Sequence, residues 1–417
     1  MRKLLTGFAQ IITCNTNGIN SKRGNYLSEI SALENHSIII EDGIIKDIIP
    51  DSSIKNISAE QNLSFKGKTI LPGLIDCHTH TAFAGSRAKE FKEKIAGVHY
   101  EEIAKRGGGI LTTVNAVRKS SFNDLIELIK PRVQEFIAQG VTTLEIKSGY
   151  GLDFENEIKL LHAINFLNEI YPIDIIPTFL GAHTFPSEYK ENHKGYVELI
   201  VDKMIPHIAK NNLAEFCDGF CEATAFNSEE IDLIFSSAVK SGLKLKLHTE
   251  QFNNVGGLDV AIKHNAVSVD HLEVIAEKDL SRFKDSETVA VLLPGVSLFL
   301  DYDFAPARKL IENNAIVALA TDYNPGSSHI LNLHLIMSLA SIKMKMKMEE
   351  VINAVTINAA KALNRETTSG SIEPGKNADF AVFDVEDYSE IIYNAGRNLV
   401  THTIKSGEII FQKQSAA

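Results

Sequence analysis

The chain has 417 residues, of which 44% are hydrophobic and 23% charged, as is typical of a soluble protein with one large domain and a smaller one. Its 42 basic and 53 acidic residues give a net charge of -11, which disfavours nucleic acid and anionic membranes as partners but allows a small anionic substrate. The four cysteines provide no disulfide framework, and no apolar run reaches the roughly 18 residues of a membrane span. The N-terminus lacks the apolar core and cleavage site of a signal peptide, so we expect a reducing, cytoplasmic setting.

The two ends of the chain predict short β-strands. Near the N-terminus they fall at residues 8–13, 37–40 and 43–49, and near the C-terminus at 380–385, 400–405 and 408–412. Neither group can bury both of its faces alone. We expect residues 1–68 and 367–417 to form one β-sandwich, the alternative being two separate small appendages.

Residues 69–366 alternate between strand and helix patterns. Candidate strands lie at residues 74–78, 142–147, 175–180, 216–222, 244–248, 266–270, 288–293 and 316–321. Helical patterns between them include residues 122–139, 155–170, 228–241 and 257–264. This alternation predicts an α/β fold in which a (β/α)8 barrel of the TIM type is inserted between the two parts of the sandwich.

Residues suited to metal binding follow four of these strands. His78 and His80 end the first strand, and alternate residues of a strand face the same side. His248 ends the fifth strand, His271 follows the sixth and Asp322 follows the eighth. Singly, each has another explanation, such as a surface histidine pair, a hydrogen-bonded core histidine or a helix-capping aspartate. Because the carboxyl ends of barrel strands share one face, their coincidence favours a common site.

Three imidazoles and one carboxylate predict one divalent or trivalent metal ion per chain, Zn²⁺ or iron as Fe³⁺, with room for a water molecule. Such an ion lowers the pKa of its water to about 7. Asp322 could contact the metal and take the proton of the water, whereas His271 is better placed as an acid or oxyanion donor than as a ligand.

Other loops after the strands carry residues suited to substrate binding. Arg87 follows a Gly-Ser turn and could bind a carboxylate, although exposure to solvent is the usual fate of an arginine. The loop at residues 147–151 has two glycines, which allow close approach of a ligand, and the hydroxyl of Tyr150; His183 follows the third strand in a similar context. The glycines at 107–109 lack the lysine of a P-loop, and we expect a mobile loop near the mouth of the barrel.

The stretches HTHTAFAGSR, EIKSGYGLD, TFLGAHTFP, HLE and TDYNPGSS together resemble the imidazolonepropionases, a family of the amidohydrolase superfamily. The resemblance covers the whole barrel and extends into GKNADFAVFD near the C-terminus. It implies hydrolysis of 4-imidazolone-5-propanoate to N-formimidoyl-L-glutamate, a step of histidine breakdown.

The resemblance also implies the roles of single residues. It places the metal ligands at His78, His80, His248 and Asp322. It places the substrate contacts at Arg87, Tyr150, His183, Asn324, Gly326 and Ser327. The family often has an acid or amide three residues after its fifth-strand histidine, which makes Gln251 and the adjacent Glu250 catalytic candidates. Two-metal relatives carry a lysine on the fourth strand; residues 216–222 contain none, which favours one metal.

Two other functions remain open at this point. An aminohydrolase of the same fold could act on a nucleobase-like ring, would release ammonia and would depend little on Arg87. A non-enzymatic scaffold would typically have lost metal ligands that are all present here. The sequence leaves open the choice between zinc and iron and the oligomeric state, and it is compatible with a homodimer.

Overall fold

The computed structural model describes residues 1–97 and 108–414, so Gly107 of the predicted glycine loop lies outside the described residues. Eight parallel strands follow one another in chain order in one sheet and form the predicted barrel. These strands are β8 (Leu74–Asp76), β9 (Val141–Lys147), β10 (Asp174–Ala182), β11 (Phe216–Cys221), β12 (Lys244–Thr249), β13 (Ser268–His271), β14 (Val289–Leu292) and β15 (Ile316–Leu319). Each overlaps a strand that the sequence predicts, and the TIM-type fold is confirmed.

The first and last barrel strands meet at their carboxyl ends. Thr79 and Tyr323 form a parallel bridge just beyond β8 and β15. The backbone N–H of Asp322 donates to the carbonyl of His78 at 3.0 Å, and that of His80 donates to the carbonyl of Tyr323 at 3.0 Å. This closure brings two segments 240 residues apart in sequence into direct contact, which places the predicted ligands of both strands side by side.

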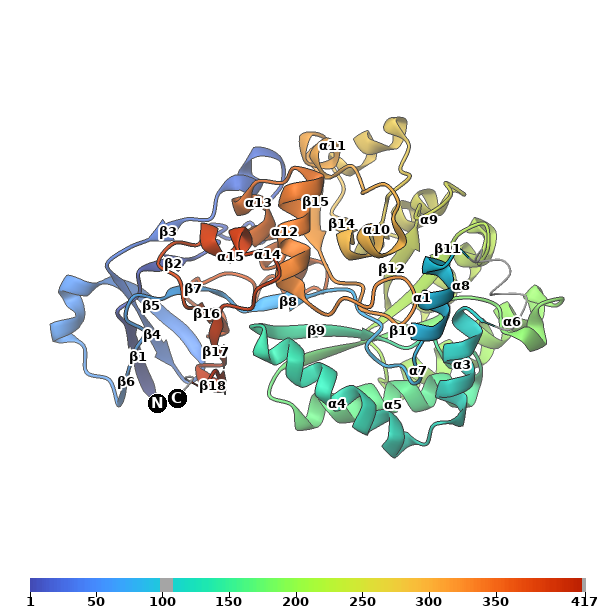
Figure 1. The fold of residues 1–417 in the computed structure, drawn as a ribbon, viewed down its shortest axis with the longest axis horizontal. Helices are drawn as coiled ribbons and strands as arrows, with labels where there is room; N and C mark the ends of the chain where they lie inside the picture. The colour runs from blue at the N-terminus through green and yellow to red at the C-terminus, as the bar shows by residue number, and fades with distance from the viewer. Residues whose placement is uncertain (98–107, 415–417) are drawn as a thin grey trace.

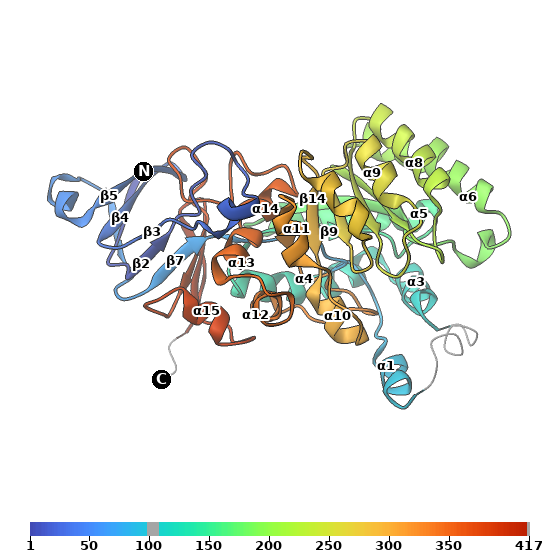
Figure 2. The ribbon, with the colours of Figure 1, turned by 90° about the horizontal axis from the view of Figure 1, so that it is seen from above.

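Helices surround the barrel (Figures 1 and 2). Those between the barrel strands are α1 (Ala88–Ile95), α3 (Ile110–Lys119), α4 (Phe122–Ala138), α5 (Phe154–Ile170), α6 (His193–Leu199), α7 (Ile205–Lys210), α8 (Ser228–Lys240), α9 (Gly257–Lys263), α10 (Pro294–Leu300) and α11 (Ala307–Glu312). After the last barrel strand come α12 (Leu333–Met344), α13 (Met348–Ala354), α14 (Ile357–Lys361) and α15 (Ser389–Tyr393). The four predicted helices correspond to α4, α5, α8 and α9.

Helix α4 illustrates why these segments are helical and face the barrel. Ser121 and Asp124 form a capping box that satisfies free N–H groups at its start. Its buried residues recur at the three- and four-residue spacing of one helix face, namely Leu125, Ile126, Ile129, Val133, Phe136 and Ile137. Burial of this face fixes the helix against the strands.

Both chain ends contribute to one β-sandwich, visible at the left of Figure 1 in blue and red. One sheet has the order β5-β4-β1-β6 and the other β18-β17-β16-β7-β2-β3. The N-terminal strands are β1 (Arg2–Thr6), β2 (Gln10–Ile12), β3 (Ala32–Leu33), β4 (His36–Glu41), β5 (Ile44–Pro50), β6 (Gln61–Ser64) and β7 (Thr69–Pro72). The C-terminal strands are β16 (Phe380–Phe383), β17 (Val400–Lys405) and β18 (Glu408–Gln412). Their buried side chains form one apolar cluster, so the single sandwich is confirmed and the two separate appendages are not found.

The chain passes from the sandwich to the barrel at Gly73. Strand β7 pairs with β2 and β16 in the sandwich, although it follows the boundary expected at residue 68. A Cβ atom on Gly73 would lie 2.1 Å from Oγ1 of Thr142, so only glycine allows this close crossing. We propose Gly73 as the first domain boundary and keep the expected second boundary at residues 366 and 367 as a proposal.

Two predictions from the composition concern the cysteines and the absence of membrane-spanning segments. All four cysteines are buried as free thiols, in agreement with the absence of a disulfide framework. Of the helices in the described ranges, none combines the length and the apolar character that a membrane crossing requires.

Candidate metal centre and substrate cavity

The four predicted metal ligands converge at the carboxyl end of the barrel. His78, His80, His248 and Asp322 are each at most 3% exposed. Oδ1 of Asp322 lies 3.3 Å from Nε2 of His78 and 3.2 Å from Nε2 of His80. Nε2 of His248 lies 3.2 Å from Nε2 of His80. His78, His80 and Asp322 thus form one group whose ligand atoms lie within 4.8 Å of one another, and His248 reaches this group through its contact with His80.

The spacing of these atoms suits a metal ion. Tetrahedral ligands at about 2.0–2.2 Å from an ion are separated from one another by roughly 3.3–3.6 Å, close to the three separations given above. Nε2 of His78 and Oδ1 of Asp322 are buried without a hydrogen-bond partner. Buried polar atoms without a partner are costly, and a cation between them would satisfy both.

Two buried carboxylates orient the histidine rings. Nδ1 of His78 lies 2.5 Å from Oδ2 of Asp270, and Nδ1 of His248 lies 3.1 Å from Oδ1 of Asp218. Donation from Nδ1 to a carboxylate leaves Nε2 of each ring as the atom free to bind a metal. The ring orientation therefore agrees with the predicted ligand role.

The protonation of the histidines also suits a cation. Burial lowers the pKa of His80 and of His248 to about 3, so both rings are neutral near pH 7, as metal ligands must be. Burial also opposes a charge on His78, but the carboxylates of Asp270 and Asp322 prevail and raise its pKa to about 9. A cation in the centre would replace the proton that these carboxylates hold on His78.

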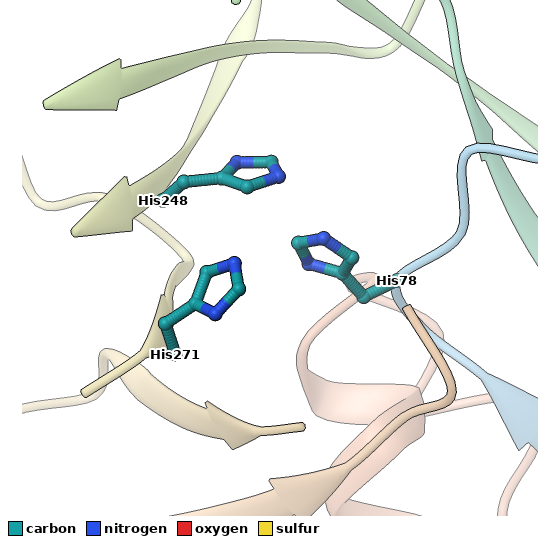
Figure 3. Close-up of side chains that lie close together, drawn as sticks. All are labelled: His78, His248 and His271. Carbon is teal, nitrogen blue, oxygen red and sulfur yellow. The ribbon is translucent and has the colours of Figure 1, made fainter. Parts of the chain in front are cut away.

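His271 lies beside the predicted ligands. Figure 3 shows the rings of His78, His248 and His271 facing one another, and one nitrogen of each ring lies within 4.8 Å of the others. Nδ1 of His271 is 3.5 Å from Oε2 of Glu273. His271 and the following Leu272 have φ angles of 90° and 69°. Such strained backbone conformations occur preferentially at functional sites.

A cavity of about 920 Å³ opens over the metal centre. Its walls include His271 and Asp322 and every residue predicted to contact substrate, namely Arg87, Tyr150, His183, Asn324, Gly326 and Ser327. Gln251 lines it as well. Glu250 is buried but is absent from the cavity wall in the described residues. Of the two neighbouring candidates, only Gln251 is placed to reach a bound molecule.

Arg87 is held at the wall of this cavity. Its Nε donates to Oε2 of Glu90 at 2.8 Å. Its guanidinium lies so close to Gly326 that a Cβ atom there would be 2.1 Å from Nη1. Gly326 therefore supplies the space that this guanidinium occupies.

A buried carboxylate shapes the loop that carries Tyr150. Glu157 accepts backbone N–H groups from Gly149 at 3.0 Å, Gly151 at 2.7 Å and Leu152 at 2.9 Å. The carbonyl of Gly149 in turn accepts Nδ1–H of His183 at 2.9 Å. Gly149 has a φ of 99°, which a side chain would disfavour. The loop thus fixes Tyr150 and His183 together.

The side-chain amide of Asn324 forms hydrogen bonds within its own loop. Its Nδ2 donates to Oδ2 of Asp322 at 3.1 Å, and its Oδ1 accepts N–H groups from Gly326 and Ser327 at 2.7 Å each. The resemblance implies a substrate contact for this amide. In the structure it holds Asp322 so that Oδ1 faces the histidines.

Sequence reasoning missed the charged layer inside the barrel below the metal centre. It comprises five fully buried residues: Glu145, Lys147, Asp218, Lys246 and Asp270. They alternate with apolar residues within β9, β11, β12 and β13, and the alternation could have marked them as facing the barrel interior. Glu157, which shapes the Tyr150 loop, was missed as well, because a glutamate in the first turn of a helix is unremarkable.

Comparisons with known proteins agree with this site. The model of the Amidohydrolase family matches residues 69–410. The imidazolonepropionase of Thermoanaerobacter pseudethanolicus is 48% identical over 92% of this chain and 92% of its own length. That of Flavobacterium johnsoniae is 41% identical over 98% of this chain and 100% of its own.

Solved structures of lower identity share the fold. An adenosine deaminase from Xanthomonas campestris with bound zinc has a TM-score of 0.73 at 17% identity, covering 98% of this chain and 92% of that one. Guanine deaminase of E. coli has a TM-score of 0.74 at 14% identity, covering 99% and 100%. At this identity the likeness shows the fold alone, whereas the sequence matches over nearly the full length show that the chain belongs to the imidazolonepropionase family of amidohydrolases.

Proposed function

We propose that this chain catalyses the hydrolytic ring opening of 4-imidazolone-5-propanoate to N-formimidoyl-L-glutamate in histidine degradation. Relatives that are 48% and 41% identical carry the name of this activity. The observation that supports it most is the convergence of three histidines and Asp322 at the floor of a cavity whose wall carries Arg87. This pairing of a cation site with an arginine suits a neutral ring that bears a carboxylate.

We assign one metal ion, Zn²⁺ or Fe³⁺, to His78, His80, His248 and Asp322. When bound, such an ion acts as a Lewis acid and makes water nucleophilic near neutral pH. Burial opposes the charge of Asp322, but the imidazoles of His78 and His80, whose Nε2 atoms lie 3.3 and 3.2 Å from Oδ1, hold its pKa well below its usual range, so the carboxylate is ionised. The orienting carboxylates Asp218 and Asp270 keep Nε2 of their histidines toward the ion.

Proton transfer is assigned to Asp322. It takes the proton of the attacking water and returns it to the ring nitrogen that leaves the carbonyl carbon. Asn324 holds Oδ2 of this carboxylate and so fixes its direction during both transfers. His271, at the end of β13, stabilises the oxygen on which negative charge develops.

Substrate binding is assigned to the cavity wall. Arg87 pairs with the propionate, since a guanidinium matches a carboxylate in shape and charge. Tyr150 and His183 position the ring, and Ser327 lies where the new carboxylate forms. Of the two candidates Gln251 and Glu250, we assign the substrate contact to Gln251, because it lines the cavity and Glu250 is not among the described lining residues.

An assay with freshly prepared 4-imidazolone-5-propanoate tests this proposal. We expect loss of the substrate absorbance and formation of N-formimidoyl-L-glutamate, identified by mass spectrometry, without release of ammonia. Ammonia release from a nucleobase-like ring, with no ring opening of the imidazolone, would favour the aminohydrolase instead. A scaffold would show neither reaction and would purify without stoichiometric metal.

A further inference from the structure

Lys147 lies at the carboxyl end of β9, fully buried beneath the metal centre. Its Nζ donates to Oδ2 of Asp218 at 2.8 Å and to Oε1 of Glu145 at 2.9 Å, and it lies 4.0 Å from Oδ2 of Asp270. Although burial disfavours its charge, these carboxylates raise the pKa of Lys147, so it is an ammonium ion. The catalytic steps above make no use of it.

Two of the carboxylates near Lys147 are those that orient the metal-site histidines. Asp218 binds Nδ1 of His248 with one oxygen and Lys147 with the other. Asp270 binds Nδ1 of His78 through Oδ2, which lies 4.0 Å from Nζ of Lys147 and 3.8 Å from Nζ of Lys246, beyond hydrogen-bond distance of both. Lys147 therefore holds the carboxylate of the Asp218–His248 pair directly.

This arrangement has an energetic consequence. A buried carboxylate without a countercharge is strongly destabilised, and it relieves this cost by rotating toward another donor or by taking up a proton. Either change would remove the acceptor that fixes the orientation and tautomer of the histidine. Loss of such an outer hydrogen bond typically weakens metal binding by about 10–100-fold.

We propose that Lys147 is a positioning residue that holds Asp218, and through it the ring of His248, in place and thereby sets the metal affinity of the site. The inference rests on the proposed metal centre and adds to it a residue that touches neither metal nor substrate. It predicts that the Asp218–His248 pair loosens when the ammonium group is removed.

Lys246 provides a matched control in the same barrel interior. It is also fully buried and also lies on a barrel strand, β12. Its Nζ donates to Oγ of Ser268 at 2.8 Å and lies 3.4 Å from the carbonyl of Ala362. It lies 3.8 Å from Oδ2 of Asp270, whose other oxygen accepts the hydroxyl of Ser268 at 2.6 Å, and within the described chain it makes no hydrogen bond to Asp218.

The test is a Co²⁺ titration of the metal-free full-length chain, comparing the wild type with Lys147→Met and Lys246→Met. Competition with a chromophoric chelator gives the affinity, and the visible absorption of Co²⁺ reports its coordination. We expect Lys147→Met to bind Co²⁺ about 10–100-fold more weakly, with an altered visible spectrum. We expect Lys246→Met to retain the wild-type spectrum. Its fold-loss of Co²⁺ affinity should be less than about a tenth of that in Lys147→Met.

Two results would overturn the proposal: unchanged affinity and spectrum in Lys147→Met, or an equal loss in both variants, which would reflect only the removal of a buried charge. If Lys147→Met does not fold by circular dichroism, Lys147→Gln, which also removes the countercharge, is judged by the same two criteria. Failure of the wild type to bind one equivalent of Co²⁺ would instead refute the metal centre. The two failures are therefore distinguishable.

Discussion

The metal centre separates two layers of the barrel that differ in chemistry and in accessibility. Above it, the cavity wall carries side chains such as Arg87 and Gln251, which line the space for a small molecule. Below it, Lys147, Asp218 and Asp270 are fully buried and bind one another or the back of the histidines. We infer that the upper layer selects and aligns the substrate, whereas the lower layer orients the metal ligands. Changes in the upper layer should therefore alter KM, and changes in the lower layer should alter metal affinity.

Asp322 lies in the metal centre between the two layers, and its loss should have the largest effect. Asp322→Ala removes a proposed ligand and the proposed proton acceptor, so we expect kcat to fall by roughly 10³-fold or more together with metal content. Steady-state kinetics and elemental analysis of the purified variant measure both quantities. Retention of the metal with more than a tenth of the wild-type kcat would contradict the assignment.

Substitution of Arg87 tests the proposed role of the upper layer in substrate binding. Arg87→Ala should raise KM by roughly 10–100-fold, because a charge-assisted hydrogen bond contributes about 1.5–3 kcal/mol. Its kcat and its Co²⁺ affinity should stay near those of the wild type. Arg308→Ala serves as a control, since Arg308 pairs with Glu350 outside the cavity wall. Equal and small effects of Arg87→Ala and Asp322→Ala would refute the separate roles.

Gly326 tests whether the space for the guanidinium matters. In Gly326→Ala the new Cβ atom would lie 2.1 Å from Nη1 of Arg87, and the flexible arginine would move aside. We expect KM to rise, but by less than in Arg87→Ala. The double variant should be no worse than Arg87→Ala, because both changes act through one contact. Additive effects in this double-mutant cycle would show that Gly326 acts by another route.

Glu250 should have the smallest effect on catalysis. Glu250→Gln should change kcat/KM by less than about threefold, as expected for a residue away from the cavity, whereas Gln251→Ala should raise KM. Burial raises the pKa of Glu250 to about 7, above its usual value of 4.5, so the ionised carboxylate destabilises the folded state above that pH. Glu250→Gln should therefore raise Tm relative to the wild type more at pH 8 than at pH 5. A lower Tm for the variant at pH 8 would contradict this environment.

The metal centre and the cavity wall above it were largely predictable from the sequence, because histidine, aspartate and arginine are residue types that commonly bind metals and carboxylates. A histidine or aspartate directly after an apolar strand, as at His248 or Asp322, is unusual enough to indicate both the strand end and a candidate ligand. The fold followed for the same reason, since strand and helix patterns alternate along the barrel. The boundary expected at residue 68 stays a prediction; β7, which follows it, pairs with β16 of the sandwich, and an apolar run carries no information about its pairing partner.

The buried charged residues of the lower layer were not predicted, and the reason is physical. Lys246 stands in the run LKLKL, which is equally typical of a strand with one solvated face. Only the closure of the barrel turns that face inward and creates the need for countercharges such as Glu145 and Asp270. Likewise, the choice between Glu250 and Gln251 depends on a backbone turn with a φ of 56° at Glu250, which the sequence does not reveal.

Reconstitution of the metal-free enzyme tests the central claim most directly. Metal is stripped with a chelator, Zn²⁺ or iron is added back in steps, and ring opening of 4-imidazolone-5-propanoate is measured beside the metal content per chain. A single metal centre predicts that activity disappears on stripping, returns linearly and reaches its plateau at one ion per chain. Full activity in the stripped protein, or a plateau only at two ions per chain, would contradict it.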